Sequence, residues 1–320
     1  MFGEWGQTNE DECRLVLDLA LESGINFIDT ADVYAFGESE TILGNVLKGR
    51  RDDVVLATKF HEPMGEDPNR RGNSRRWITK AVDDSLRRLQ TDWIDLYQVH
   101  RPDPSCDIDQ TLGALTDLVR AGKVRAIGTS TFPAEQLVMA QWVAEKRGRE
   151  RFVTEQPPYS IFARAVEASV LPACQDLDLG VIVWSPLNGG WLTGKYQRGK
   201  ELPGDSRAAR NPDHFDYDHP VRQRKLDLVE ALLNVADEAG ITLTQLALAF
   251  TLEHPAVTAA IVGPRTPQQL ADQIPAADIA LDTAVLDAID ALIEPGFNVN
   301  QAETGWVTPA LLPGQRRRPR

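Results

Sequence analysis

The sequence has few cysteines, and their positions exclude two common uses of this residue. The chain contains three, Cys13, Cys106 and Cys174, and their wide separation fits neither a disulfide framework nor a C-x-x-C metal site. The five histidines show no spacing typical of zinc enzymes. The sequence therefore predicts no bound metal ion, and the unpaired thiols indicate the reducing environment of the cytoplasm.

Basic residues are also scarce. Lys and Arg number 34 against 47 Asp and Glu, which gives the 320-residue chain a formal net charge of −13. Such a charge repels nucleic acids and anionic membrane surfaces, so neither is an expected partner. No run of 18 apolar residues and no signal segment is found, which argues against a membrane-spanning helix. The one basic cluster, RRRPR, is predicted to belong to a disordered tail at 315–320.

No linker rich in Pro, Gly or Ser divides the chain, so a single domain over residues 1–320 is expected. What the sequence does contain is a set of short apolar runs rich in β-branched residues. Their apolarity is continuous rather than alternating, as in parallel strands that are buried on both faces. The predicted strands comprise Ile25–Ile28, Val54–Ala57, Trp93–Val99, Val124–Ile127, Phe152–Val153, Val181–Trp184 and Val257–Val262.

Amphipathic helical segments lie between these runs, and one helix is predicted from about Arg76 to Gln90. Three such segments pass through a glycine directly into an apolar run, so Gly24, Gly122 and Gly180 are predicted to be left-handed C-terminal caps. Strand–helix alternation requires a parallel sheet with right-handed crossovers. We therefore predict a (β/α)8 TIM barrel with extra C-terminal helices. An open doubly wound sheet is the alternative, but no predicted strand is followed by its G-x-G-x-x-G fingerprint.

Ionisable residues close three successive apolar runs. Asp29 follows the first, Lys59 the second and His100 the third, and Tyr34 lies in the loop after Asp29. The carboxyl ends of barrel strands share one mouth, so these side chains are expected to meet there. Taken singly, each has an ordinary explanation as a turn residue, a solvated strand end or a packed ring. Their matched positions favour a site.

Two long irregular segments, Glu62–Asn73 and Asn188–Pro220, follow predicted strands. Long loops in compact domains are often functional covers, and in a barrel both would lie on the active face. The second contains His214 and His219 in a polar stretch, which predicts a surface loop rather than a ligand pair. Both segments are therefore expected near the mouth.

A set of motifs runs in order along most of the chain, from about residue 2 to residue 275. It comprises FIDTADVYAFGESE, LATKF, LYQVHRPD, RAIGTSTF, EQPPYS, WSPLNGGWLTGKY and IVGPRTPQQL. Together these motifs resemble those of the aldo-keto reductase superfamily, which also includes β subunits of potassium channels. The resemblance implies NADPH-dependent reduction of an aldehyde or ketone, with a catalytic tetrad at Asp29, Tyr34, Lys59 and His100.

Physical chemistry agrees with the roles that the resemblance implies. Hydride addition to a carbonyl leaves an alkoxide that needs a proton, and a free phenol, with a pKa of about 10, donates poorly near neutrality. An ammonium about 4 Å away favours the phenolate by roughly 4 kcal/mol at an effective dielectric constant of about 20. Tyr34 is thus implied as the acid, with Lys59 beside it and Asp29 as the anchor of Lys59. His100 is implied to hydrogen-bond the carbonyl oxygen.

The resemblance also implies how NADPH is bound without a Rossmann fold. Ser130, Thr131 and Gln156 match the positions that hold the nicotinamide carboxamide, and Trp184 matches the ring that stacks on the nicotinamide. Glycines in the next loop let backbone N–H groups approach the pyrophosphate, and Arg265 suits a 2′-phosphate, which favours NADPH over NADH. The other implied cofactor-binding residues are Ser185, Pro186, Leu187, Gly189, Leu192, Gly194, Lys195, Gly263, Gln269 and Gln273.

Relatives begin with an N-terminal hairpin and a first barrel strand that ends near a motif like MFGEWG, where this chain begins. Seven strands with two unpaired edges are therefore expected, through a misassigned start or a fragment whose barrel closes in another way. Beside a reductase with a small-molecule carbonyl substrate, two alternatives stay open: a non-enzymatic regulatory subunit of the potassium-channel β type and an inactive truncated homologue. Substrate choice is expected to depend on the loops at 60–73, 101–107 and 298–313.

Overall fold

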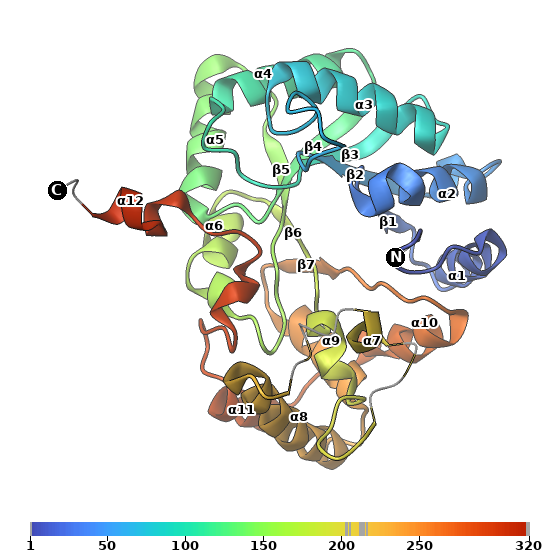
Figure 1. Ribbon diagram of the computed structural model, residues 1–320, viewed down its shortest axis with the longest axis vertical. Helices are drawn as coiled ribbons and strands as arrows, with labels where there is room; N and C mark the ends of the chain where they lie inside the picture. The colour runs from blue at the N-terminus through green and yellow to red at the C-terminus, as the bar shows by residue number, and fades with distance from the viewer. Residues whose placement is uncertain (1, 202–203, 205, 211–214, 216, 318–320) are drawn as a thin grey trace.

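The chain forms a seven-stranded parallel sheet that curls into an open barrel. The computed structural model describes residues 2–201, 204, 206–210, 215 and 217–317. The strands are neighbours in sequence order from β1 to β7 (Figure 1). Their bounds are Phe27–Asp29 (β1), Val55–Phe60 (β2), Ile94–Val99 (β3), Val124–Ser130 (β4), Phe152–Gln156 (β5), Gly180–Val183 (β6) and Val257–Ala260 (β7).

Helices alternate with the strands and cover the outside of the curl. In Figure 1, α2 to α5 lie along the upper side of the sheet and α8 to α11 along the lower side. The helices are Glu10–Glu22 (α1), Glu38–Val46 (α2), Arg75–Leu89 (α3), Ile108–Arg120 (α4), Ala134–Arg147 (α5), Val170–Asp176 (α6), Arg207–Arg210 (α7), Pro220–Glu238 (α8), Leu243–Glu253 (α9), Pro267–Gln273 (α10), Thr283–Leu292 (α11) and Pro313–Arg316 (α12). Two of the short 3₁₀ helices matter for the site, namely Tyr34–Gly37 (η1) and Asn188–Thr193 (η4).

The predicted architecture of the (β/α)8 barrel type is confirmed. Each neighbouring pair of strands is parallel, and all seven predicted apolar runs contribute a strand. Within the described residues no ladder joins β1 to β7, so the barrel is open along one side. There α1 packs against α10 through Val16, Ala20 and Leu270. This contact brings the first and the tenth helix together beside the open edge.

The inside of the curl has an apolar layer and a polar layer. Ala57, Leu96 and Ile182 form a small buried cluster against which Phe27 of β1 packs. Residues two apart on a strand face the same side of a sheet, so the side chain of Lys59 follows that of Ala57 along the inner face. The apolar layer therefore supports the polar side chains at the carboxyl ends of the strands, as in other barrels.

Of the three glycines predicted as left-handed C-terminal caps, two are confirmed and one is not. Gly24 and Gly122 have φ of 81° and 73°, which confirms them as left-handed residues after helices. The prediction for Gly180 was wrong, because this residue begins β6. Helix α6 ends earlier, at Asp176, and Asp178 takes the left-handed conformation instead, with φ of 54°. Asp adopts this conformation at a lower cost than most residues because its short side chain bonds locally.

The predicted surface features lie partly outside the described residues. His214 is outside them, whereas His219 is exposed and accepts a hydrogen bond from the Val221 backbone at the start of α8. Of the predicted tail at 315–320, the last three residues are also outside, and helix α12 includes its first two.

A close contact between α2 and α3 generates a test of the fold. A β-carbon on Gly44 of α2 would lie 2.8 Å from the carbonyl carbon of Leu89 in α3. We expect Gly44→Ala to lower the free energy of unfolding by about 1–3 kcal/mol, because the backbone of α3 would have to move. In an uncrowded helix the same change stabilises by about 0.5–1 kcal/mol. Urea unfolding followed by circular dichroism measures the difference.

The matched control for this test is Thr41→Ala, on the exposed face of the same helix. Its effect should stay within about 0.5 kcal/mol, as for most surface substitutions. A Gly44→Ala protein as stable as the original would contradict the close packing of α2 on α3.

Candidate active site

Polar side chains converge inside the barrel at the carboxyl ends of the strands. Asp29 ends β1, and one of its oxygens pairs with the ammonium of Lys59 on β2. The other oxygen accepts hydrogen bonds from the side-chain amides of Gln98 on β3 and Gln156 on β5, both at 3.0 Å. Gln156 also donates to Oε1 of Gln98 at 3.1 Å. A single carboxylate thus links side chains from four strands.

Lys59 is held as a buried ammonium. Its side chain is completely enclosed, and Nζ also donates to the carbonyl oxygen of Thr30 at 2.9 Å. Burial by itself would lower the pKa of Lys59, but the neighbouring Asp29 and Tyr34 raise the pKa above its ordinary value. Lys59 therefore carries its positive charge throughout the physiological pH range.

The Tyr34 ring lies close to both Lys59 and His100. Nζ of Lys59 is 5.2 Å from the centre of the Tyr34 ring, and the centres of the Tyr34 and His100 rings are 5.9 Å apart. The next two residues, Ala35 and Phe36, have left-handed φ of 47° and 51°. This conformation costs a non-glycine residue about 1–2 kcal/mol, and such strain is concentrated at functional sites. The strained turn sets the position of the phenol.

His100 completes the group of four side chains that we call the tetrad, with Asp29, Tyr34 and Lys59. Its side chain is buried, and Nδ1 has no hydrogen-bond partner among the described residues. Burial, followed by the positive charges of Lys59 and Arg101, lowers the pKa of His100 well below its usual value. The imidazole is therefore neutral near pH 7 and carries a single ring N–H donor.

The residues expected to hold a nicotinamide carboxamide lie at the ends of β4 and β5. The Ser130 hydroxyl donates to the backbone oxygen of Gln156 at 2.9 Å, and the backbone N–H of Thr131 donates to the same oxygen at 3.1 Å. The side-chain nitrogen of Gln156 is engaged by Asp29 and Gln98. The side-chain oxygen of Gln156 is then the amide atom that can accept a hydrogen bond from a ligand.

Trp184, which follows β6, lies under the C-terminal segment. A β-carbon on Gly305 would be 2.7 Å from Cζ2 of Trp184 and 3.0 Å from Cγ2 of Thr131. The Trp184 indole nitrogen is buried and has no hydrogen-bond partner among the described residues. On another side, the guanidinium of Arg101 lies 5.8 Å from the centre of the Trp184 ring. Gly305 is the residue type that this close approach allows.

The loop after Trp184 provides a cradle for an anion. Two glycines in it are bordered by cations: a β-carbon on Gly190 would lie 3.4 Å from Nζ of Lys195, and one on Gly189 would lie 3.6 Å from Nη1 of Arg207. The backbone N–H groups of Asn188 and Gly190 donate to carbonyl oxygens within the loop, so the fit to a pyrophosphate rests on the two cations and on the space at the glycines. The left-handed residues of this loop are Ser185, Asn188, Gly189, Gly190 and Gly194.

Other predicted contacts in this loop are placed differently. Leu192 is fully buried in the main core, and its backbone N–H donates to the carbonyl oxygen of Leu187 at 3.2 Å. Pro186 is buried too. Leu192 and Pro186 support the loop from its buried side, whereas Ser185 and Lys195 are half-exposed.

A buried ion pair connects this loop to the C-terminal segment. Lys225 of α8 is 2% exposed; its ammonium pairs with Glu303 and donates to Oδ1 of Asn188 at 2.6 Å. The side-chain nitrogen of Asn188 donates to the other oxygen of Glu303 at 2.9 Å. The three side chains form a closed network, which we call the loop–tail network.

The last predicted cofactor residues follow β7. Gly263 and Arg265 precede α10, and the backbone N–H of Arg265 donates to Oε1 of Gln269 at 2.8 Å. Gln273 ends α10, and its side-chain oxygen is buried without a partner among the described residues. The N-terminal segment approaches here as well, because the Gln7 side chain donates to the Arg265 carbonyl oxygen at 3.3 Å.

Sequence reasoning missed several residues of this region. Gln98 was recognisable as a polar residue within a buried strand, at even spacing from His100. Trp5, whose ring centre lies 6.4 Å from that of Tyr34, carried no sequence signal of its own. Arg101, Arg207 and Glu303 lie in segments that were expected near the mouth, but nothing in the sequence singled out these side chains.

Two features of the described residues bear on other functions. No group of three or more His, Cys, Asp or Glu side chains within them could hold a metal ion. Their helices include none with the length and apolarity needed to cross a membrane.

Comparison with known proteins places these features in context. The sequence model described as "Aldo/keto reductase family" matches residues 1–294. The chain is 41% identical over 308 residues to an uncharacterized oxidoreductase, YrpG, of Bacillus subtilis. The aligned region covers 92% of this chain and 91% of that protein. It is 38% identical over 269 residues to the aldo-keto reductase YhdN of the same species, covering 83% and 78%. It is also 35% identical over 303 residues to a probable voltage-gated potassium channel subunit beta of Arabidopsis thaliana, covering 92% of both.

The environment of His100 predicts its titration. Because its pKa is depressed in the folded state, we expect its imidazole NMR signals to stay constant between pH 8 and about pH 6. In the urea-unfolded chain the same residue should titrate near pH 6.5. The folded state then binds fewer protons than the unfolded state below about pH 6.5, so the contribution of His100 to stability is lost as the pH falls.

The His100→Gln spectrum assigns the signal in this experiment. A midpoint at or above about 6.5 in the folded protein would contradict the neutral, buried imidazole.

Proposed function

Because the chain belongs to the aldo/keto reductase family, we propose that it reduces an aldehyde or ketone to an alcohol with NADPH as the hydride donor. The observation that carries the proposal is the geometry around Tyr34. Its ring lies 5.2 Å from a fully buried ammonium and 5.9 Å, between ring centres, from a neutral imidazole. A phenol between a fixed cation and a hydrogen-bond donor is suited to protonating an alkoxide.

Tyr34 gives its hydroxyl proton to the oxygen of the reduced carbonyl. The phenolate that remains is stabilised by Lys59, whose charge at about 5 Å contributes roughly 3 kcal/mol at an effective dielectric constant of about 20. Asp29 keeps Lys59 charged and in place, and Gln98 and Gln156 fix the orientation of the Asp29 carboxylate. The four strands that carry these residues hold the donor in position before substrate arrives.

His100 orients the carbonyl group. Its neutral ring donates one N–H hydrogen bond to the substrate oxygen, which is the same oxygen that receives the proton from Tyr34. An imidazolium would compete with Tyr34 as the acid and would repel the Lys59 ammonium. The depressed pKa of His100 therefore supports a division of labour in which Tyr34 alone gives up a proton.

NADPH supplies the hydride when bound. Lys195, Arg207 and the Gly189–Gly190 turn bind the pyrophosphate, and the fit rests on the space that β-carbons at the two glycines would fill. Arg265 binds the 2′-phosphate as a guanidinium. Ser130, Thr131 and Gln156 hold the carboxamide, and Trp184 contacts the nicotinamide ring. The other residues proposed to bind the cofactor are Ser185, Leu187, Gly194, Gly263, Gln269 and Gln273, whereas the buried Pro186 and Leu192 support the loop.

The substrate that best fits the mouth has an aromatic or bulky apolar group beside its carbonyl. Trp5 and Phe36 flank Tyr34 and are 45% and 66% exposed, so apolar surface is available next to the proton donor. An apolar recess of about 160 Å³, lined in part by Phe132, Val166 and Trp306, also lies against the C-terminal segment. The proposal also places the protein in the cytoplasm, supported by its three free thiols.

The relatives named as potassium channel β subunits support a second candidate, a non-enzymatic regulatory subunit that binds NADPH. The exposed apolar side chains Val138, Met139 and Trp142 on α5 offer such a subunit a contact surface. An inactive homologue is the third candidate. Turnover of aromatic aldehydes with NADPH, followed at the nicotinamide absorbance, separates the first candidate from the other two.

Tyr34→Phe tests the proton donor. We expect kcat/KM for an aromatic aldehyde to fall by about 10²–10⁴-fold, because this is the usual contribution of general acid catalysis. The Kd for NADPH should change less than twofold, since the ring remains. The control is Tyr97→Phe, which removes a buried hydroxyl from β3 on the outer face of the barrel. Full turnover in Tyr34→Phe would rule out Tyr34 as the acid.

Arg265→Gln tests the choice of cofactor. We expect the Kd for NADPH to rise about tenfold or more, because a charge-assisted contact to the 2′-phosphate is lost. NADH lacks this phosphate and serves as the internal control, with a Kd expected to change less than twofold. Fluorescence titration measures both constants. An equal loss for the two cofactors would contradict the assignment of Arg265.

A further inference from the structure

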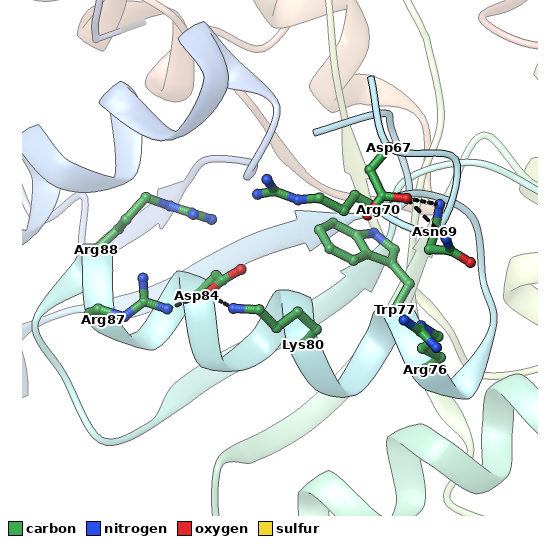
Figure 2. Close-up of a pocket in the computed structure, with 9 residues that line it drawn as sticks. All are labelled: Asp67, Asn69, Arg70, Arg76, Trp77, Lys80, Asp84, Arg87 and Arg88. Atoms are coloured by element: carbon green, nitrogen blue, oxygen red, sulfur yellow. Dashed lines mark hydrogen bonds and ion pairs between the residues drawn. The ribbon is translucent and has the colours of Figure 1, made fainter. Parts of the chain in front are cut away.

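A separate pocket lies on the outside of the barrel, away from the tetrad and from the apolar recess. It has a volume of about 500 Å³, which is within the usual range for small-molecule sites. One wall is the outer face of α3, and the other is the loop between β2 and α3 (Figure 2). The lining residues are Asp67, Asn69, Arg70, Arg76, Trp77, Lys80, Asp84, Arg87 and Arg88.

The lining is strongly basic in an acidic protein. Five of its nine residues are cations and two are carboxylates, although the whole chain has a net charge of −13. Three of the cations, Arg76, Lys80 and Arg87, lie on one face of α3, because successive members are four and seven residues apart. At 1.5 Å per residue the row extends for about 16 Å. This length exceeds what a single small anion needs.

Existing ion pairs leave much of this charge uncompensated. Asp84 pairs with both Lys80 and Arg87, and Glu40 pairs with Arg88 at 2.7 Å. The Lys80 and Arg87 side chains are nevertheless 59% and 67% exposed. Since an ammonium has three N–H donors and a guanidinium five, one shared carboxylate occupies few of them. The remaining donors are available to a ligand.

The other end of the pocket has two further arginines. Arg70 and Arg76 form no salt bridge within the described part of the chain. The guanidinium of Arg70 lies 6.0 Å from the centre of the Trp77 ring, and Figure 2 shows its side chain extending across that ring. Asp67 is the one carboxylate at this end and interacts with both arginines, so the two guanidinium groups leave a net positive charge where the loop meets α3.

Trp77 supplies an independent observation. Its side chain is 2% exposed, and its indole N–H has no hydrogen-bond partner among the described residues. Buried donors are nearly always paired in folded proteins, so an unpaired one requires an explanation. In Figure 2 the indole lies between α3 and the loop residues Asp67 and Asn69, as part of the pocket lining. An anionic oxygen in the pocket would accept this hydrogen bond.

We propose that this pocket binds a small soluble polyanion with two or more phosphate groups, such as a nucleoside triphosphate. One phosphate binds Arg70, Arg76 and the Trp77 N–H at the loop end. Another binds the free donors of Lys80 and Arg87 further along α3. Phosphate suits this lining because guanidinium groups bind it through paired N–H donors.

The overall charge of the chain argues against larger anionic partners. A membrane surface or a nucleic acid would meet the field of the entire protein, with its excess of carboxylates, whereas a small ligand meets chiefly the pocket. The recessed shape also favours a small ligand that enters the pocket rather than a large partner that docks through a flat surface. The proposed occupant is therefore a free metabolite.

Isothermal titration calorimetry with tripolyphosphate and with ATP tests the proposal. Both should bind with a stoichiometry near one, in the presence of saturating NADP⁺ as well as in its absence. Arg70→Gln/Arg76→Gln should weaken binding about tenfold or more. The matched control, Arg71→Gln/Arg75→Gln, removes the same charge from neighbouring residues that do not line the pocket, and should change affinity less than twofold. Trp77→Phe removes the N–H donor together with part of the buried indole ring, and should weaken binding about threefold or more while the variant stays folded, as judged by circular dichroism.

Each other result would overturn the proposal. Equal losses in the two double variants would indicate general charge attraction, and competition by NADP⁺ would place the anion in the cofactor loop. Absence of saturable binding would remove the site altogether. Binding to vesicles with phosphorylated inositol lipids, but not to ATP, would replace the soluble ligand with a membrane. Because the Arg70 and Arg76 variants report on this pocket alone, the result stands whether or not the protein reduces carbonyls.

Discussion

The buried ion pair between Asp29 and Lys59 is the interaction on which the mouth of the barrel depends. Removing one partner of such a pair leaves an uncompensated buried charge, at a cost of about 3–5 kcal/mol. Losing Asp29 would also leave Gln98 and Gln156 without a hydrogen-bond acceptor, because the Asp29 carboxylate accepts a hydrogen bond from each. The pair therefore connects β1, β2, β3 and β5 at the end where each strand stops. A displaced strand would break a charged contact as well as a ladder, so the pair enforces the curl of the sheet at this end.

The ion pair also explains why strain is tolerated next to it. Ala35 and Phe36 adopt left-handed conformations immediately after Tyr34. Such a turn persists only where the surroundings fix it, and here the chain on its N-terminal side is anchored through Asp29 and the carbonyl oxygen of Thr30, both held by Lys59. The same lysine thus stabilises the turn and supplies the charge beside the phenol. Stability and chemistry depend on one side chain.

Much of the fold was predictable because strands buried on both faces leave a continuous apolar signature. The boundaries were less predictable: the predicted run Val54–Ala57 stops before the polar residues that complete β2, because Thr58 and Lys59 continue the strand while bonding to Glu40 and Asp29. The positions of the tetrad came from matched strand ends and from the motifs. The contributions of Arg207 and Glu303 were not predictable, because they depend on contacts between segments far apart in sequence whose local patterns are those of ordinary surface residues.

The loop–tail network has an evolutionary consequence. Lys225 is buried against Asn188 and the partly exposed Glu303, so a mutation of either partner leaves the buried ammonium short of a hydrogen-bond acceptor. Lineages that diversify the C-terminal segment to accept new molecules must keep this triangle or replace its corners together. Substitutions at the three positions are thus expected to occur together. Directed-evolution libraries would retain more folded members if these three positions were randomised jointly.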